Sequence, residues 1–465
     1  MNMNDITNRA EELTAYAKQY LELDERDEIY IKNRLLEILQ KCDGPEPDEQ
    51  ETDEIFAVLS LLPSALNRRF DNILHSCGSK AATDWFYSYC VHNRYVKKDV
   101  LDKNPRFESN GLIITINKAK PEFRDPQKAR VGNSVEGGFC KCVICRENEG
   151  FGARNKRNLR TVDIWLGGEK WFWQYSPYGY FNEHGIAVNC SHIPMHIDGS
   201  TFTKLMDFAD MFPHYFIGCN APLPRIGGSV LSHDHFQGGG EILPVHTAKA
   251  AYILRHDDYP DALAEVVDWP GTVIRVVSEN RRSIGDICGV INKKWVKYSD
   301  IKSGIIAEDN EGVHNAVSPT VRKTERGYEM NVILRSNITS SMLPDGVFHA
   351  HPEYHVIKKE SIGLIEAQGL FILPGRLSGE LAAVEKMIDE NAPLLPGYTA
   401  FRLIYDETKA ICLREGVGAR EAMKAELGSI CFRILENTAV FKDKRQTVKF
   451  LNDLGFRLCS DTNIK

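Results

Sequence analysis

Two histidine pairs, each following a β-rich stretch, constrain the fold of this chain most. Short runs of β-branched and aromatic residues, bounded by Gly, Pro and Asn, begin near residue 111 and lead to "SHDHFQ" at 232–237. A second such stretch leads to "FHAHPEYH" at 348–355. Runs of this kind are typical of strands and hairpins. The arrangement indicates an α+β chain with a diverged internal duplication, although no simple repeat period is legible.

The two ends of the chain have a helical pattern. Apolar residues recur at three- and four-residue spacings in "RDEIYIKNRLLEIL" near the start and in "REAMKAELGSICFRILENTA" near the end, and this periodicity predicts amphipathic helices. A chain of 465 residues is too long for one hydrophobic core. We therefore predict an N-terminal helical region (1–110), a first β-rich half (111–245), a second β-rich half (246–380) and a C-terminal helical region (381–465).

Three segments inside the β-rich halves carry more specific predictions. "STFTKLMDFADMF" predicts a helix with Ser200 or Thr201 as its N-cap. "DICGVINKKWVKYSD" at 286–300 is strand-like. The aromatic run "WFWQYSPYGYFNEH" at 171–184 suits either a core cluster or a platform for stacking a base.

Composition excludes several classes of function. A net charge of −7 argues against a nucleic-acid partner. The longest apolar runs are interrupted and too short to cross a bilayer, and the N-terminus lacks the pattern of a signal peptide. Most of the twelve cysteines lie in apolar surroundings, which predicts buried free thiols in a reducing, cytoplasmic compartment. The clearest of these are Cys190, Cys219, Cys288, Cys412 and Cys431.

The motif "SHDHFQGGG" is a candidate for phosphorus chemistry. On a strand, His233, His235 and Gln237 would share one face, and flanking glycines let the backbone approach an anionic ligand. An imidazole can attack phosphorus as a nucleophile, while the amide of Gln237 can donate to a phosphate oxygen. Spacing alone also allows a metal site or a solvated glycine-rich turn.

A C-x-x-C pair, Cys142 and Cys145, supplies half of a tetrahedral zinc site. His192 and His233 are the obvious suppliers of the other two ligands. The flanking sequence does not place Cys142 at a helix start within a βαβ pattern, so a redox role is disfavoured. The alternative is a turn whose cysteines bind nothing.

Two further clusters suggest ligand contacts. Arg154, in the loop "NEGFGARNKRNLR", suits a phosphate, although such runs are more often solvated loops. No G-x-x-x-x-G-K-[ST] motif occurs in the chain, so a P-loop kinase or ATPase loses its main support. In the second histidine cluster, His349 and His351 again have same-face spacing, which fits metal ligation, substrate contact or a relic of duplication.

Several ordered segments together resemble one family, the galactose-1-phosphate (UDP-glucose–hexose-1-phosphate) uridylyltransferases of the bacterial second class, in the histidine-triad superfamily. They are "CVICRENEGF", "WQYSPYGYFNEHGIAV", "FPHYFIGCNAPLPRIGGSVLSHDHFQGG", "YEMNVILRSNIT" and "FHAHPEYHVIKKESIGLIEAQGLFILPGRL". The resemblance runs from about residue 130 to the C-terminus. It implies an α+β fold of duplicated histidine-triad-like antiparallel sheet units, with a helical N-terminal region and a helical C-terminal tail.

The resemblance also implies an activity. A uridylyl group would pass from UDP-glucose to galactose 1-phosphate, giving UDP-galactose and glucose 1-phosphate, through a uridylyl-histidine in a ping-pong mechanism. The nucleophile of the family matches His235, and Gln237 matches the amide that holds the phosphoryl group. Asp234 stands where the first class of the family has proline.

Further ligands follow from the same resemblance. A structural zinc ion would be held by Cys142, Cys145, His192 and His233. Substrate contacts would come from Asn220, Gly228, Ser229, Arg154 and His351, with Arg154 reaching a phosphate in the neighbouring subunit of a homodimer. His349 and His351 match the histidine pair of an iron site in the first class, but its partnering glutamate and histidine have no match, and no iron is predicted.

Two alternatives stay open at this point. One is a related histidine-triad nucleotidyl phosphorylase or hydrolase, although hydrolases of that group have a further histidine at the position of Gln237. The other is a catalytically silent protein that binds a sugar nucleotide or zinc, which the intact His233, His235 and Gln237 disfavour.

Overall fold

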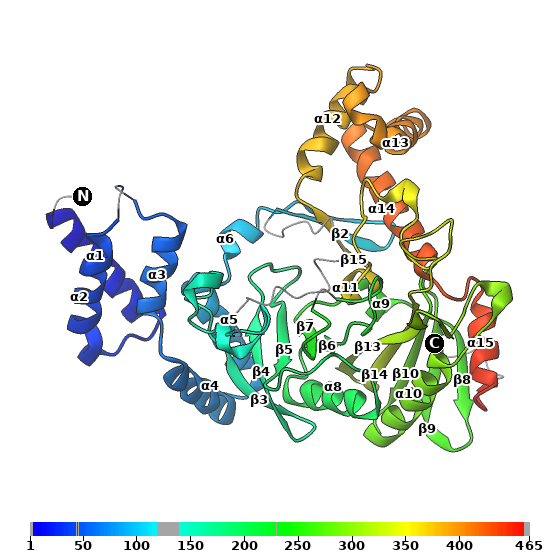
Figure 1. Ribbon diagram of the computed structural model, residues 1–465, viewed down its shortest axis with the longest axis horizontal. Coiled ribbons are helices and arrows are strands. Elements are labelled where there is room, and N and C mark those ends of the chain that lie inside the picture. Colours follow the sequence, from blue (N-terminus) through cyan, green and yellow to red (C-terminus); the bar gives the residue numbers. More distant parts are fainter. Residues whose placement is uncertain (1–2, 43, 45, 119–138, 229, 460–465) are drawn as a thin grey trace. The chain divides into compact units, whose positions relative to one another are not determined.

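The computed structural model describes residues 3–42, 44, 46–118, 139–228 and 230–459. Figure 1 shows the elements coloured along the sequence. Contacts divide the chain into two compact units. Unit 1 comprises Met1–Asp102, Gly132–Ile193 and Ser232–Gly239, and unit 2 comprises Lys103–Val131, Pro194–Leu231 and Gly240–Lys465. The four-part division made from the sequence stays a prediction.

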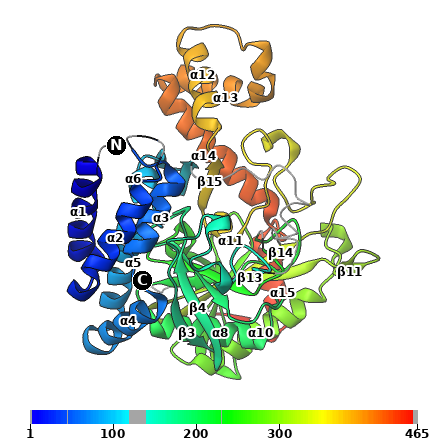
Figure 2. The ribbon, with the colours of Figure 1, turned by 60° about the vertical axis from the view of Figure 1, so that its left-hand side comes forward.

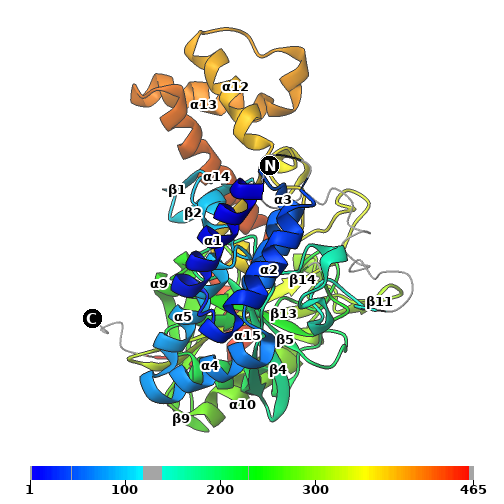
Figure 3. The ribbon, with the colours of Figure 1, turned by 90° about the vertical axis from the view of Figure 1, so that its left-hand side faces the viewer.

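Unit 1 begins with helices, as the apolar periodicity predicts. They are α1 (Met3–Tyr20), α2 (Glu28–Leu39), α3 (Glu49–Leu59), α4 (Pro63–Cys77), α5 (Ser79–His92) and the short α6 (Lys98–Leu101). Helices α1 and α2 pack side by side (Figure 3), α2 contacts α3, and α4 contacts α5 and strand β3. Asp48 caps α3 by accepting a hydrogen bond from the N–H of Glu51, so the helix starts where an acidic side chain satisfies an end amide.

Four antiparallel strands of unit 1 carry the "HDHFQ" motif. They are β3 (Val162–Leu166), β4 (Glu169–Tyr175), β5 (Gly185–Asn189) and β7 (His235–Gly239), in the order β3-β4-β5-β7. Figure 2 shows β3 and β4 side by side. Trp171 and Trp173 are fully buried, and the Trp171 ring stacks on Phe236 with centroids 4.7 Å apart. These tryptophans therefore belong to the core, which favours that interpretation of the aromatic run over a base-stacking platform.

Unit 2 contains a larger antiparallel sheet. Its strands are β6 (Phe216–Gly218), β8 (Ala250–His256), β9 (Tyr259–Val267), β10 (Val273–Ser278), β13 (Asn315–Thr324), β14 (Gly327–Ser336) and β16 (Arg457–Leu458). The order is β16-β8-β9-β10-β14-β13-β6. Helices α8 (Gly199–Met211) and α10 (Arg281–Val296) pack against each other and against this sheet (Figure 1).

A small second sheet and the tail helices complete unit 2. Strands β1 (Arg106–Ser109) and β2 (Leu112–Asn117) are antiparallel, and β15 (Leu370–Pro374) runs parallel to β2. The remaining elements are α9 (Pro244–Thr247), β11 (Glu308–Asp309), β12 (Gly312–Val313), α11 (Leu364–Ala367), α12 (Leu377–Asp389), α13 (Arg402–Glu415), α14 (Ala419–Thr438) and α15 (Lys444–Asn452). The mixed α+β fold with antiparallel sheets and helical ends confirms the predicted fold class.

Two local predictions are wrong. The segment 286–300, expected to be strand-like, belongs largely to helix α10, whose buried residues include Ile284, Ile287, Cys288 and Ile291 at helical spacing. Ile287 and Ile291 are buried on one helical stripe while Val290 is exposed, so tertiary packing outweighs β-propensity. The N-cap of α8 is Asp198 rather than Ser200 or Thr201, because its carboxylate accepts both of their N–H groups.

All twelve cysteines are free, in agreement with the expectation of free thiols. Cys219, Cys288 and Cys431 are buried as expected, but Cys190 is exposed and Cys412 is only half-buried. Cys190 directly follows the last residue of β5, at the point where the chain leaves the sheet. Among the described residues, no helix has the length and apolar character needed to cross a membrane.

Candidate active site

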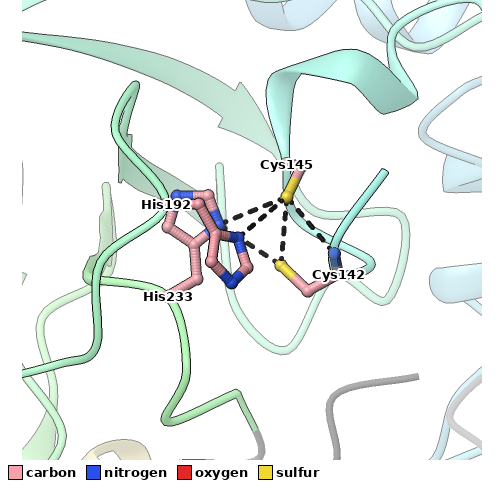
Figure 4. A group of neighbouring side chains, drawn as sticks. All are labelled: Cys142, Cys145, His192 and His233. Atoms are coloured by element: carbon pink, nitrogen blue, oxygen red, sulfur yellow. Dashed lines mark hydrogen bonds between the residues drawn. The ribbon is translucent and has the colours of Figure 1, made fainter. Parts of the chain in front are cut away.

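Two cysteines and two histidines converge in unit 1 (Figure 4). The ligand atoms of Cys142, Cys145, His192 and His233 all lie within 4.8 Å of one another. Nδ1 of His233 is 3.2 Å from Sγ of Cys142, and Nδ1 of His192 is 3.2 Å from Sγ of Cys145. Within the described part of the chain, this is the one group of three or more such side chains placed to hold a metal ion.

The turn that presents the two thiols is held by a neighbouring amide. Asn148 is fully buried, and its Nδ2 donates to the carbonyl oxygens of Cys142 and Cys145 at 2.9 and 2.8 Å. The N–H of Cys142 also donates to Sγ of Cys145 at 3.3 Å. These bonds fix the backbone of the turn, and each sulfur atom lies 3.2 Å from a histidine nitrogen.

The dimensions of the cluster fit a tetrahedral zinc ion. Zn–S bonds of about 2.3 Å and Zn–N bonds of about 2.0–2.1 Å separate neighbouring ligand atoms by roughly 3.3–3.8 Å. The two Sγ atoms are 3.4 Å apart. Nε2 of His233 donates to the carbonyl of Asn189 at 2.8 Å, which leaves the lone pair on Nδ1, the atom that faces the thiols.

The pKa values of the two thiols are shifted in opposite directions. The hydrogen bond from Cys142 lowers the pKa of Cys145, burial opposes this effect, and His192 lowers the pKa further. The same hydrogen bond raises the pKa of Cys142, since this thiol supplies the proton. A metal ligand must be a thiolate, so the cluster already favours one of the two charges that a bound cation requires.

His235 lies immediately after the cluster, at the start of β7. Its Nδ1 donates to the carbonyl of His233 at 2.8 Å, so the neutral ring carries its lone pair on Nε2. Burial lowers the pKa of His235 to about 4, although the hydrogen bond to His233 opposes this effect. The ring is therefore neutral near pH 7, the state in which an imidazole nitrogen can act as a nucleophile.

Gln237 shares a sheet face with His235. Val188 and Ile186 of β5 lie opposite His235 and Gln237, and Phe236 turns to the other face and packs on Trp171. Gln237 is half-buried. His233 lies outside the strand, so the structure pairs His235 with Gln237 and assigns the ring of His233 to the cluster.

Two glycines around the motif are needed for packing within the protein. A Cβ atom on Gly239, whose φ is +153°, would lie 2.4 Å from the carbonyl oxygen of Glu183. A Cβ atom on Gly227 would lie 2.0 Å from the carbonyl oxygen of Ala221. From the sequence, we expected these glycines to leave room for a ligand. At both positions, however, the space beside the glycine is filled by a backbone carbonyl of the protein itself.

Of the substrate contacts predicted in unit 2, Asn220 and Gly228 pack together, and His351 lies elsewhere in the unit. Asn220 is buried, and its Oδ1 accepts from the N–H of Leu364 at 2.9 Å. A Cβ atom on Gly228 would lie 2.8 Å from Nδ2 of Asn220, so these two residues pack together. His351 lies in a loop, where its N–H donates to Asn437. Ser229 lies outside the described residues.

Arg154 belongs to unit 1. Its Nη2 donates to the carbonyl of Cys140 at 3.0 Å, close to the cysteine turn. Arg160, from the same arginine-rich loop, is buried and donates to the carbonyl of Leu61 through Nε. One arginine of this run is thus a structural residue.

His349 and His351 do not form a strand pair. The segment is irregular, and Nδ1 of His349 donates to the carbonyl of Ala350 at 3.1 Å. Burial lowers the pKa of His349 to about 4. In the described chain, neither residue belongs to a group able to hold a metal ion.

Three residues around the site were missed by the sequence reasoning. The side chain of Asn148 donates to the backbone of the cysteine turn, and the backbone carbonyl of Asn189 accepts from the ring of His233. His184 packs beside Gln237. The polar residue Asn148, three residues after a C-x-x-C pair, is a local signal that could have been used. The other two depend on strand pairing.

The fold and site together define an α+β protein in which a Cys₂His₂ cluster adjoins a buried neutral histidine. Residues 7–194 match the family domain described as "Galactose-1-phosphate uridyl transferase, N-terminal domain", and residues 208–392 match the corresponding C-terminal domain. The galactose-1-phosphate uridylyltransferase of Bifidobacterium longum subsp. longum is 54% identical over 417 residues, covering 89% of this chain and 81% of that protein. The enzyme of the same name from Streptococcus mutans serotype c is 37% identical over 422 residues, covering 87% and 84%.

The crystal structure of yeast Ap4A phosphorylase Apa2 aligns with 68% of this chain and 90% of its own, with a TM-score of 0.32 and 11% identity. That similarity is too low to bear on function. The two domain matches and the two bacterial relatives show that the chain belongs to the galactose-1-phosphate uridyl transferase family of nucleotidyltransferase enzymes.

Proposed function

We propose that this protein transfers a uridylyl group from UDP-glucose to galactose 1-phosphate, giving UDP-galactose and glucose 1-phosphate. The observation that carries the proposal is the neutral, buried ring of His235, with its tautomer fixed by the carbonyl of His233. Membership of the family supports the substrate pair. It also disfavours a histidine-triad hydrolase and a protein without catalytic activity.

His235 acts as the nucleophile in the first of two displacements and as the leaving group in the second. In the first, the lone pair on Nε2 attacks the α-phosphorus of UDP-glucose, a P–N bond forms, and the P–O bond to glucose 1-phosphate breaks. In the second, a phosphate oxygen of galactose 1-phosphate attacks the same phosphorus and the P–N bond breaks, releasing UDP-galactose. The two steps divide one difficult transfer into two easier ones.

Gln237 and the carbonyl of His233 serve this cycle in different ways. The imidazole becomes positively charged when Nε2 bonds to phosphorus, and the carbonyl that accepts from Nδ1 stabilises that charge. Gln237, on the same face, donates through its amide to a non-bridging phosphoryl oxygen. Asn220, Gly228, Ser229, Arg154 and His351 are proposed to contact the substrates.

Cys142, Cys145, His192 and His233 would hold a zinc ion. The cluster provides four protein ligands, which leaves no open position and indicates a structural role. When bound, the ion fixes the ring of His233 and hence the carbonyl that orients His235. We further propose a cytoplasmic homodimer, and the twelve free thiols support the reducing compartment.

The test is turnover together with trapping of the intermediate. Purified protein is incubated with UDP-glucose and galactose 1-phosphate, and release of glucose 1-phosphate is followed. UDP-glucose labelled in the uridylyl group is then supplied alone, and label on the protein is measured. His235→Asn is expected to lose both signals with an unchanged circular dichroism spectrum, whereas His196→Asn, an exposed histidine, keeps both. Turnover by His235→Asn at the wild-type rate would overturn the assignment of the nucleophile.

A further inference from the structure

His184 lies beside Gln237 on the sheet face that also carries His235. Ile186 lies opposite Gln237, and His184 precedes Ile186 by two residues, so it occupies the same face. The N–H of Ser176 donates to the carbonyl of His184 at 2.8 Å, which extends the β4–β5 pairing to this position. His184 is therefore a diagonal cross-strand neighbour of Gln237, within reach of a long side chain.

The ring of His184 is tightly enclosed. The residue is 4% exposed, and its ring stacks on Tyr180 with centroids 4.8 Å apart and planes inclined by 21°. The ring of Phe181 packs against it at 4.5 Å. Burial lowers the pKa of His184 to about 3, and a side-chain interaction with Gln237 opposes that effect. His184 is thus a neutral imidazole held in one orientation.

The backbone selects one tautomer of this ring. The N–H of Tyr180 donates to Nδ1 of His184 at 3.4 Å, so Nδ1 is the acceptor and Nε2 carries the proton. Nε2 is fully enclosed, and within the described residues no acceptor meets it with standard hydrogen-bond geometry. The side chain of Gln237 also interacts with this ring. A buried N–H group without a good acceptor is costly, so this one favours any arrangement that supplies a carbonyl oxygen.

We propose that His184 is a positioning residue, whose Nε2–H donates to Oε1 of Gln237 and so directs the NH₂ group of that amide towards the phosphoryl group on His235. An amide has one acceptor end and one donor end. If Oε1 faced a phosphoryl oxygen, two acceptors would meet. A neutral histidine that can only donate at Nε2 selects the productive orientation and adds no charge. The inference rests on the proposed role of Gln237.

A double-mutant cycle tests this inference. His184→Leu removes the donor, and His184→Gln keeps an N–H near the Nε2 position. These two variants and Gln237→Ala are each made alone, and His184→Leu is also combined with Gln237→Ala. We expect His184→Leu to lower kcat roughly 10- to 100-fold, with His184→Gln recovering much of the loss. In the Gln237→Ala background, His184→Leu should change kcat less than about twofold, since the residue acts through the amide.

The controls separate positioning from folding and from the proposed function. His246→Leu, in unit 2, removes another buried histidine whose pKa burial lowers to about 3, and it should lower the melting temperature without changing kcat. If His184→Leu does not fold, His184→Asn takes its place in the cycle, because its shorter amide does not reach the Nε2 position. An equal loss of kcat from the His184 variant in both backgrounds overturns the positioning role. A wild-type kcat for Gln237→Ala alone overturns instead the proposed role of Gln237.

Discussion

The carbonyl oxygen of His233 accepts a 2.8 Å hydrogen bond from Nδ1 of His235, while the ring of His233 lies 3.2 Å from the thiol of Cys142. One residue thus contacts the cysteine cluster through its side chain and orients the neighbouring histidine through its backbone. The two histidines of the motif differ because one precedes strand β7 and the other begins it.

Removing the ring of His233 should uncouple these two contacts. In His233→Ala the cluster keeps three of its four side chains. The carbonyl of residue 233 is then no longer held in place by a ring that contacts Cys142. We expect zinc content to fall and kcat to drop about 10- to 100-fold, as for other residues that orient reactive groups. Zinc is measured by elemental analysis of purified protein, with His196→Ala as the control. A variant without zinc but with wild-type kcat would contradict this coupling.

Asn148 should be a stability determinant of the cysteine turn. Asn148→Ala removes the side-chain donor to the carbonyls of Cys142 and Cys145, each of which keeps one backbone N–H donor. We expect the free energy of unfolding to fall by about 1–3 kcal/mol, the loss of two hydrogen bonds at about 0.5–1.5 kcal/mol each. Urea denaturation measures the change. Lys141→Ala, at an exposed position beside the turn, should change it by less than about 0.5 kcal/mol.

Stability should decrease as the solution becomes acidic. Burial lowers the pKa of His184 and of His246 to about 3, whereas an unfolded histidine titrates near 6.5. Between those values the unfolded chain binds protons that the folded chain does not. Each histidine therefore lowers the free energy of unfolding by about 1.4 kcal/mol per pH unit as the pH falls below about 6.5.

His246→Gln isolates one of these contributions. The variant has no titrating group at this position, so its free energy of unfolding should fall less steeply between pH 6.5 and 5 than that of the wild type. Urea denaturation at several pH values gives both slopes. His196→Gln, at an exposed position, serves as the control. Equal slopes for wild type and His246→Gln would show that His246 does not contribute to this acid sensitivity.

Gly228 should be intolerant of a side chain. In Gly228→Ala the new Cβ atom would lie 2.8 Å from Nδ2 of Asn220 and displace an amide that accepts from Leu364. We expect KM for UDP-glucose to rise roughly 5- to 10-fold, equivalent to about 1 kcal/mol. Gly199→Ala, where nothing lies within 4 Å of the new atom, is the matched control. An unchanged KM would remove Gly228 from the proposed contacts.

The start of helix α8 offers a direct comparison of two capping candidates. Asp198→Ala removes the acceptor for the N–H groups of Ser200 and Thr201 and should cost about 1 kcal/mol. Ser200→Ala removes a hydroxyl that itself donates to Asp198 and should cost less. Thermal or urea unfolding of both variants gives the order. The reverse order would restore Ser200 as the cap.

Local patterns in the sequence predicted the helical ends, the β-rich middle and the four residues of the Cys₂His₂ cluster. The C-x-x-C pair limits two ligands to one turn, and the spacing of His235 and Gln237 places them on one face once the segment is a strand. Helix α10 was missed because β-branched residues such as Ile287 and Ile291 are equally compatible with a strand until the sheet that the helix packs against is known.

The spacing of the H-x-H pair does not distinguish His233 from His235, and the family resemblance alone implied different roles for them. Only the tertiary structure shows a physical difference: the 142–145 turn lies beside the ring of His233, whereas His235 begins strand β7. The contact between His184 and Gln237 likewise requires the pairing of β5 with β7, which joins residues about fifty positions apart. Side-chain chemistry is set by composition, but tautomer and orientation are set by hydrogen-bond partners that come from distant parts of the chain.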